Sequence, residues 1–291
     1  MNVLSLFNGM STGHTALENV GIKVNKYYSS EIKPAAIKLT QHHYPDTIQL
    51  GDVEKWKEWD IDWKSIDMVL SGSPCQDLSI VGKRKGLEGK RSSLFWVFVD
   101  ILNHIKELNP NVLFLQENVG SAPVGDVGIM SRALGVYPVR INSSLVTAQL
   151  RDRYYWSNIR TTADGFFGDI KTDIPLPEDK KIILKDIITS GVVDRDKHTC
   201  LTEHYQKAYN FGHRDSKKWQ DYAKKRVRNT GTTTLITKDN LVRIVNKIEM
   251  CRLQGFPDDW CDILTTVEAG SLLGDGWTLP IIEHIFSYIK T

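Results

Sequence analysis

The stretch Val3-Leu4-Ser5-Leu6-Phe7-Asn8-Gly9-Met10-Ser11-Thr12-Gly13 decides the fold, because a short apolar run passes there into a glycine-bearing turn. The next residues, HTALENVG at 14–21, have apolar spacing suited to a helix that ends at Gly21. Comparable strand-like runs recur at 26–31, 47–53, 66–74 and 111–119. Strands that alternate with helices in this way predict an α/β fold with a mostly parallel sheet and helices on both faces.

The composition is that of an ordinary globular chain of 291 residues, with 41% hydrophobic and 25% charged residues. It excludes a disordered, collagenous or disulfide-rich protein. The longest apolar run, 94–102, contains Asp100 and is too short to span a membrane, and the first residues show no basic leader. We therefore expect a cytoplasmic protein. The four cysteines lack metal-binding spacing, so no metal site is expected.

Charge is distributed unevenly, although the net charge is only +2. Five basic residues and one acidic residue lie between Lys83 and Arg91, and eight basic residues and two acidic ones lie between Lys207 and Arg228. Two local basic segments in a nearly neutral chain suggest contact with a polyanion at defined places. A solvated surface remains the alternative for each segment.

The rhythm of strands and helices predicts three parts of the chain. Residues 1–160 are expected to form a first, larger domain. Residues 161–228 are richer in Asp, Lys, Gly and Pro and are expected to form a smaller, irregular domain. Residues 229–291 regain helical and β-like patterns and are expected to rejoin the first domain.

Three strand ends carry residues suited to a nucleotide-like cofactor. Ligands of parallel sheets bind beyond the carboxyl ends of the strands. The turn after the first strand contains Gly9, Glu31 ends the second strand, and Asp52 follows the third. A carboxylate such as Glu31 can accept hydrogen bonds from ribose hydroxyls, and Asp52 can accept one from an adenine amino group. An ordinary turn and surface carboxylates are the alternatives, but three such ends together favour a nucleoside-containing cofactor.

The fourth strand end is Ser73-Pro74-Cys75-Gln76. Cys75 follows a rigid proline and precedes a glycine-containing basic segment, which is the setting of a nucleophilic thiolate. Glu117, at the end of the strand 111–119, is its candidate partner, because a carboxyl group there can protonate a ring nitrogen during thiolate attack. A structural cysteine and a surface glutamate remain open on these residues alone.

Five segments in this order resemble the DNA cytosine-5 methyltransferase family, and the resemblance covers nearly all of the chain except 161–228. They are SGSPCQDLSIVGKRKGLEGKRSSLF (71–95), QENV (116–119), QLRDR (149–153), RLQGFP (252–257) and LGDGWT (273–278). The first motif of the family usually begins with Asp where this chain has Ser5, and the last usually reads G-N-S or G-N-A where this chain has Gly274-Asp275-Gly276. Both variants, with Trp277, are similar to the de novo branch of the animal DNA methyltransferases.

The resemblance implies S-adenosylmethionine as cofactor, S-adenosylhomocysteine as product, and flipping of a cytosine out of double-stranded DNA. It makes residues 1–160 the catalytic and cofactor-binding domain and residues 161–228 the target-recognition domain. It assigns catalysis to Cys75, Glu117, Arg151 and Arg153. It assigns cofactor binding to Phe7, Gly9, Met10, Glu31, Ile32, Asp52, Val53, Pro74, Leu94, Asp275, Gly276 and Trp277. The DNA-binding candidates are Ser79, Ile80, Val81, Lys83, Arg84, Lys85, Arg214, Lys217, Lys218, Arg226 and Arg228.

Two other classes of function stay open: a catalytically silent DNA-binding relative, which would have no need of the four catalytic residues, and an RNA cytosine-5 methyltransferase. A restriction-modification system, a phage and a stand-alone regulator are all compatible with a compact chain, for which we expect a monomer but leave an oligomer open. The target sequence is not readable from the residues. The aromatic residues Phe95, Trp96 and Phe98 are predicted to lie in the core.

Overall fold

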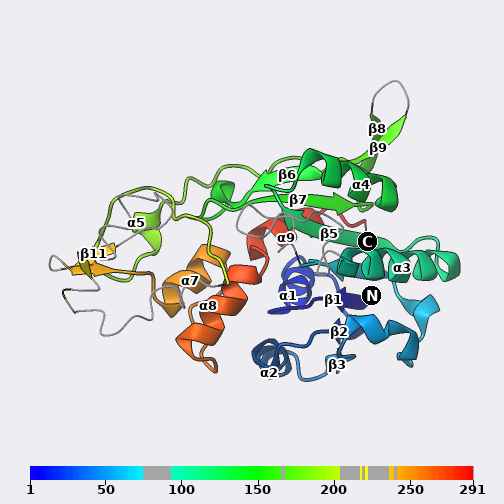
Figure 1. The fold of residues 1–291 in the computed structure, drawn as a ribbon, viewed down its shortest axis with the longest axis horizontal. Coiled ribbons are helices and arrows are strands. Elements are labelled where there is room, and N and C mark those ends of the chain that lie inside the picture. Colours follow the sequence, from blue (N-terminus) through cyan, green and yellow to red (C-terminus); the bar gives the residue numbers. More distant parts are fainter. Residues whose placement is uncertain are drawn as a thin grey trace. The chain divides into compact units, whose positions relative to one another are not determined.

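The computed structural model describes residues 1–74, 93–164, 168–203, 217, 220, 221, 236–238 and 241–290 (Figure 1). The chain divides into two compact units, one of residues 1–141, 152–176 and 282–291, the other of residues 142–151 and 177–281. In the described residues, no helix is long and apolar enough to cross a membrane.

A seven-stranded sheet forms the centre of the first unit, with strand order β3-β2-β1-β4-β5-β7-β6. The strands are β1 (Asn2–Leu6), β2 (Lys26–Ser30), β3 (Ile48–Gln49), β4 (Met68–Ser71), β5 (Leu113–Val119), β6 (Val139–Asn142) and β7 (Asp152–Ser157). The pairs from β3 to β5 are parallel, and β7 runs antiparallel to β5. The predicted α/β fold with a mostly parallel sheet is confirmed.

Helices pack on this sheet as the sequence predicts. They are α1 (Thr12–Asn19), α2 (Pro34–His43), α3 (Ser93–Leu108) and α4 (Val124–Leu134). Phe95 and Phe98 of α3 are buried in the same core cluster as Leu4 and Leu6 of β1. The prediction of a core position was wrong for Trp96, which is exposed because it lies about 100° around the helix from Phe95.

The order of the strands places a switch point at β1. The chain adds β2 and β3 on one side of β1 and then returns to place β4 on the other side. In open α/β sheets, ligands bind beyond the carboxyl ends of the strands at such a switch point. The residues after β1 and after β4 are therefore the first place to look for a binding site.

The second unit contains shorter elements. They are α5 (Leu184–Ile187), β10 (Val192–Val193), β11 (Ile236–Lys238), β12 (Leu241–Arg243), α7 (Lys247–Gln254) and α8 (Thr266–Asp275), and α9 (Leu279–Phe286) begins in this unit and ends in the first. Glu249 caps the start of α7 through Asn246 and pairs with Arg243 at 2.7 Å. Burial opposes its charge, but hydrogen bonds from Arg243, Thr189 and Asn246 outweigh that effect and lower its pKa.

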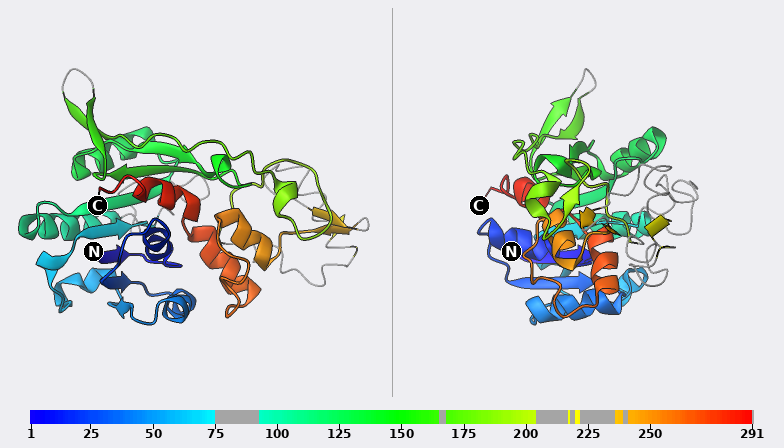
Figure 2. Two further views of the ribbon diagram at one scale, coloured as in Figure 1. Left: turned by 180° about the vertical axis from the view of Figure 1, so that it is seen from behind. Right: turned by 90° about the vertical axis from the view of Figure 1, so that its left-hand side faces the viewer.

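The two units differ from the ranges that the sequence suggested. Residues 142–151 belong to the second unit, and of the C-terminal part only residues 282–291 belong to the first. A hairpin of β8 (Thr161–Asp164) and β9 (Asp169–Thr172) belongs to the first unit and projects from its sheet in both views of Figure 2. Target recognition by residues 161–228 stays a prediction.

Gly128 in α4 and Gly135, which follows the last residue of α4, give a test of the helix backbone. Gly128 lies inside the helix, and an added Cβ would meet only the flexible end of Arg132, at 3.4 Å. Gly128→Ala should raise the free energy of unfolding by about 0.5–1 kcal/mol, since alanine loses less backbone entropy on folding. Gly135 ends the same helix with φ 73°, so Gly135→Ala should lower it by about 1–2 kcal/mol. Urea titration measures both, and shifts of the same sign would contradict this account.

Candidate active site

The turn after β1 has a strained backbone. Phe7 and Ser11 adopt φ of 57° and 59°, a region that non-glycine residues rarely enter, and Gly9 between them has φ 56°. The buried Asn8 side chain holds the turn. Its amide donates to Ser11 Oγ at 2.8 Å, and its carbonyl oxygen accepts from Tyr27 Oη at 3.1 Å. Strain held in this way is typical of ligand-binding turns.

His14 stands behind this turn in α1. Its ring stacks between Tyr27 and Tyr44, with centroid distances of 4.4 and 3.8 Å. Burial lowers the pKa of His14 to about 4, so the imidazole is neutral at pH 7. The stack therefore supports the turn by packing and does not contribute a charge.

Glu31 links the turn to the end of β2. Its Oε2 accepts from the Gly9 main-chain N–H at 2.8 Å, and its Oε1 accepts from those of Ile32 and Lys33 at 2.8 and 2.9 Å. A carboxylate offers about four acceptor positions. The backbone takes three of them, which leaves room for about one further donor such as a ribose hydroxyl.

The other predicted cofactor residues lie in different settings. Ile32 is exposed beside Glu31, while the side chains of Met10 and Val53 are buried. Asp52 accepts a hydrogen bond from the Glu54 main-chain N–H at 3.0 Å and so caps a short 3-10 helix. Pro74 and Leu94 are partly exposed. The predicted cofactor residues divide between the two units. Asp275, Gly276 and Trp277 belong to the second unit, and the first contains Phe7, Gly9, Met10, Glu31, Ile32, Asp52, Val53, Pro74 and Leu94.

Cys75 itself lies outside the described residues, but the strand end before it is well anchored. The buried Ser73 accepts a hydrogen bond at 2.9 Å from Gln116, whose side chain also donates to the main-chain oxygen of Glu117 at 2.7 Å. Gln116 and Glu117 are neighbours on β5. The peptide segment that leads to Cys75 is thus tied to the strand that carries Glu117.

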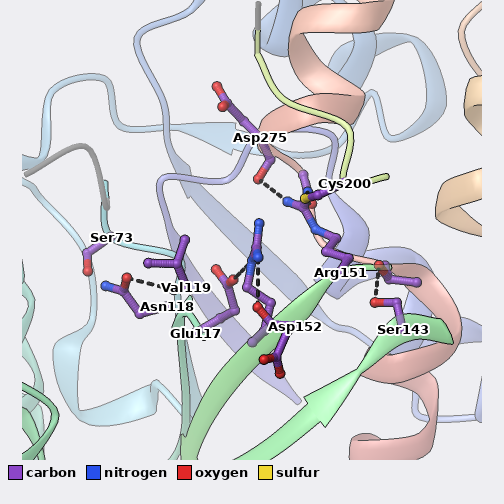
Figure 3. Close-up of polar contacts among 12 residues, drawn as sticks. Ser73, Glu117, Asn118, Val119, Ser143, Arg151, Asp152, Cys200 and Asp275 are labelled. Atoms are coloured by element: carbon purple, nitrogen blue, oxygen red, sulfur yellow. Dashed lines mark hydrogen bonds and ion pairs between the residues drawn. The ribbon is translucent and has the colours of Figure 1, made fainter. Parts of the chain in front are cut away.

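Glu117 and Arg153 form an ion pair that is almost closed to solvent. Arg153 Nε lies 2.8 Å from Glu117 Oε1, and 13% and 11% of these side chains are exposed. In the antiparallel register Arg153 faces Val119, two residues from Glu117, so both side chains lie on one face of the sheet. Figure 3 shows Glu117, Asn118 and Val119 at this end of β5, where the Asn118 side chain accepts from the Val119 N–H at 2.8 Å.

Arg151 makes different contacts, within the second unit. Arg151 is 3% exposed, and its guanidinium donates to main-chain oxygens of Leu201, Gly274 and Gly276 at 3.1, 3.1 and 2.7 Å. It also donates to the main-chain oxygen of Asp275 at 3.4 Å (Figure 3). The carbonyls at the end of a helix lack partners within it and carry a partial negative charge. Arg151 therefore caps the end of α8 and holds the Gly274–Gly276 segment.

Two glutamines extend this network, and the sequence analysis assigned neither of them a role. Gln149 donates to Leu253 O at 3.1 Å and accepts from Leu201 N at 2.8 Å. Gln254 donates to Gly276 O at 3.3 Å and accepts from Thr278 Oγ1 at 2.9 Å. Their positions in the sequence could have indicated a role, because Gln149 is the first residue of QLRDR and Gln254 lies within RLQGFP. Gln149 and Arg151 of QLRDR thus bind the motifs RLQGFP and LGDGWT within the second unit.

The predicted DNA-binding residues lie almost entirely outside the described residues. This applies to Ser79, Ile80, Val81, Lys83, Arg84, Lys85, Arg214, Lys218, Arg226 and Arg228. Lys217 is described and exposed. Their contacts with DNA stay predictions. In the described ranges, no group of three or more His, Cys, Asp or Glu side chains is arranged to hold a metal ion.

Arg151 offers a test of this capping network. Arg151→Met removes the buried donors of at least three carbonyls and should lower the free energy of unfolding by about 2–4 kcal/mol, because those acceptors lose charge-assisted hydrogen bonds. Arg195→Met, in the same unit, disturbs a more exposed pair with Asp194 and should cost less than about 1 kcal/mol. Urea or thermal unfolding compares the two, and equal losses would refute a capping role.

Comparison with known families gives a match over most of the chain. The family described as C-5 cytosine-specific DNA methylase matches residues 1–123 and 141–291. Among curated relatives, the orphan methyltransferases M.Rho11sI of Bacillus phage rho11s and M.SPRI of Bacillus phage SPR are each 34% identical over 175 residues. These alignments cover 55% of this chain but only 33% and 38% of the phage proteins, so the match spans about a third of their length.

A longer alignment joins the chain to the type II methyltransferase M1.ScrFI of Lactococcus lactis subsp. cremoris. It is 27% identical and covers 90% of this chain and 71% of that one. Solved structures share the fold at lower identity. The Entamoeba histolytica methyltransferase EhMeth has a TM-score of 0.67 at 16% identity, covering 99% of this chain and 97% of that one. A Spodoptera frugiperda DNMT2 mutant has a TM-score of 0.62 at 18% identity, and the alignment covers 99% of each chain.

Proposed function

Because the chain belongs to the C-5 cytosine-specific DNA methylase family, we propose that it methylates carbon 5 of a cytosine in double-stranded DNA. The observation that carries the proposal is the buried Glu117–Arg153 pair, whose glutamate lies on β5, the strand tied to the segment before Cys75. This arrangement supports a site in which Glu117 is the acid, Arg153 binds the cytosine base and Cys75 is the nucleophile. S-adenosylmethionine, when bound, supplies an electrophilic methyl group.

Carbon 5 of cytosine is a poor nucleophile, because it belongs to an aromatic ring. The residues of this chain must therefore activate it. The Cys75 thiolate forms a bond to carbon 6, while Glu117 gives a proton to the ring nitrogen, so that carbon 5 becomes electron-rich and takes up the methyl group. A base then removes the proton from carbon 5, Cys75 leaves with its electron pair, and the ring nitrogen returns its proton to Glu117, which restores the aromatic ring and the acid. Arg153 contacts the base oxygen and keeps Glu117 in place.

The turn after β1 supports binding of the nucleoside part of this cofactor. Glu31 has an acceptor position to spare after its three backbone hydrogen bonds, and the exposed Ile32 offers an apolar surface next to it. An exposed large apolar side chain beside a carboxylate suits an adenosine, which has an apolar ring face and a hydroxyl-bearing sugar. Asp52, Asp275 and Trp277 are further proposed contacts.

Double-stranded DNA is the proposed partner. A cytosine inside a duplex cannot reach Cys75, so it must be flipped out at a cost of about a few kcal/mol. The basic segments 83–91 and 207–228 are proposed to neutralise phosphates and so offset this cost. In a methyl-transfer assay, competition between duplex DNA and tRNA separates this substrate from RNA.

The covalent mechanism has a direct test. Cys75→Ser should abolish methyl transfer while S-adenosylhomocysteine binding stays within about threefold, because serine supplies no thiolate at neutral pH. Glu117→Gln should slow transfer by about 10²–10⁴-fold, since it removes a proton donor. Wild-type protein should form a denaturation-resistant adduct with DNA that carries 5-fluorocytosine. If the protein methylates a given sequence but forms no adduct when that sequence carries 5-fluorocytosine at the target position, the covalent step is excluded.

Cofactor binding by the strand ends has a separate test. Glu31→Ala and Asp52→Ala should each weaken binding of S-adenosylhomocysteine by about 1–3 kcal/mol, because a buried hydrogen-bond donor of the ligand is left unpaired. Glu58→Ala, an exposed carboxylate of the same unit, serves as control and should change nothing. Calorimetric titration measures all three. Unchanged affinity in both test variants would place the cofactor elsewhere.

A further inference from the structure

Arg140 and Asp152 lie at the two ends of a segment that leaves the first unit. The chain enters the second unit after Ile141 and returns at Asp152. Arg140 Nε donates to Asp152 Oδ2 at 2.9 Å, and Arg140 Nη2 contacts the same oxygen. One ion pair therefore closes the loop formed by residues 141–151.

The backbone of Gly120 lies close to the carboxylate of Asp152. A Cβ added to Gly120 would lie 2.7 Å from Asp152 Cγ and 2.8 Å from Oδ2, so only glycine leaves room for this side chain. Gly120 directly follows the strand that carries Glu117. The guanidinium of Arg140 also lies over the ring of Tyr154, 5.3 Å from its centroid. Asp152 is thus fixed between Gly120 and Arg140.

The peptide carbonyl of Asp152 connects this clamp to the acid. It accepts from the Gly120 N–H at 2.9 Å and from Arg153 Nη1 at 2.8 Å, while Arg153 Nε holds Glu117 at 2.8 Å. Successive side chains of a strand point to opposite faces. The Asp152 carboxylate therefore lies on one face of the sheet and the Arg153 guanidinium on the other. The peptide group between Asp152 and Arg153 links the two side chains.

We propose that Arg140 and Asp152 form a positioning pair that sets Arg153, and through it Glu117, for proton transfer. The inference rests on the proposed function, because it assigns Glu117 the role of acid. The pair acts through the backbone: when it is broken, the carbonyl that orients Arg153 Nη1 loses its clamp. A misplacement of about 1 Å at a reacting group can slow an enzyme by up to about 10²-fold.

The first unit offers a matched control pair. Arg160 lies 3.0 Å from Asp173 and over the ring of Tyr288 at 5.4 Å, so it is also an arginine–aspartate pair with an arginine–tyrosine contact. Its side chains are 46% and 38% exposed, compared with 54% and 34% for Arg140 and Asp152. Arg160 pairs with Asp173, whereas the carbonyl that accepts from Arg153 belongs to Asp152.

The kinetic experiment compares Arg140→Ala and Asp152→Asn with Arg160→Ala and Asp173→Asn. Single-turnover methyl transfer to duplex DNA should be about tenfold slower in the first two variants, and unchanged in the control pair. Affinity for S-adenosylhomocysteine and for DNA should stay within twofold, and unfolding temperatures should match those of the controls. In an Arg153→Ala background, Arg140→Ala should have no further effect on the rate.

A second readout does not depend on activity. In the NMR spectrum, the Arg153 Nε–H signal, assigned by its loss in Arg153→Lys, should be protected from solvent exchange in the wild type and in Arg160→Ala, but not in Arg140→Ala. If wild-type protein transfers no methyl group to DNA, the proposed function fails, while this signal still decides the positioning role. Unchanged rates and protection in Arg140→Ala, or equal losses in the control pair, would overturn the inference.

Discussion

The antiparallel register of β5 and β7 is the constraint on which the candidate site depends. Because the side chains of a strand alternate between faces, a slip of one residue would move Arg153 to the side opposite Glu117. Core packing prevents such a slip: Trp156 of β7 and Phe114 of β5 are both buried, and Ser157 Oγ donates to Phe114 O at 2.7 Å. The ion pair that the chemistry needs is thus fixed by apolar residues several positions away.

A second constraint acts at the end of β1. Backbone strain at Phe7 and Ser11 costs about 1–3 kcal/mol per residue, and it persists because the surrounding groups are fully engaged. Asn8 contacts Ser11, Thr40 and Tyr27, and the Glu31 carboxylate fixes the Gly9 N–H. The shape of the turn is therefore set by the protein alone, so a ligand bound there need not supply the energy of ordering it.

Much of this was predictable from local sequence. The apolar runs located β1, β2, β4 and β5, and the residues at their ends identified Glu31 and Glu117 as candidates. The run at 47–53 gave only the two-residue strand β3, because Gly51 leaves the extended conformation with φ 74° and Asp52 then caps a 3-10 helix. Trp96 was misplaced although Asp100, four residues further along α3 and so on the same face, is exposed and marks the solvent side of the helix. Cys75 rests on sequence alone.

The motif QLRDR shows best what a sequence pattern cannot reveal. Its five residues cross from one compact unit to the other: Gln149 and Arg151 bind main-chain groups of the second unit, some of them more than 100 positions away, while Arg153 binds Glu117 in the first. Periodicity gives no information about partners so distant in the chain. Asp152 lies at the crossing and is bound by Arg140. The chain's passage between the units explains the spacing of Arg151 and Arg153. Arg151 binds main-chain groups of the second unit and Arg153 binds Glu117 of the first, while Asp152 between them lies where the chain returns to the first unit.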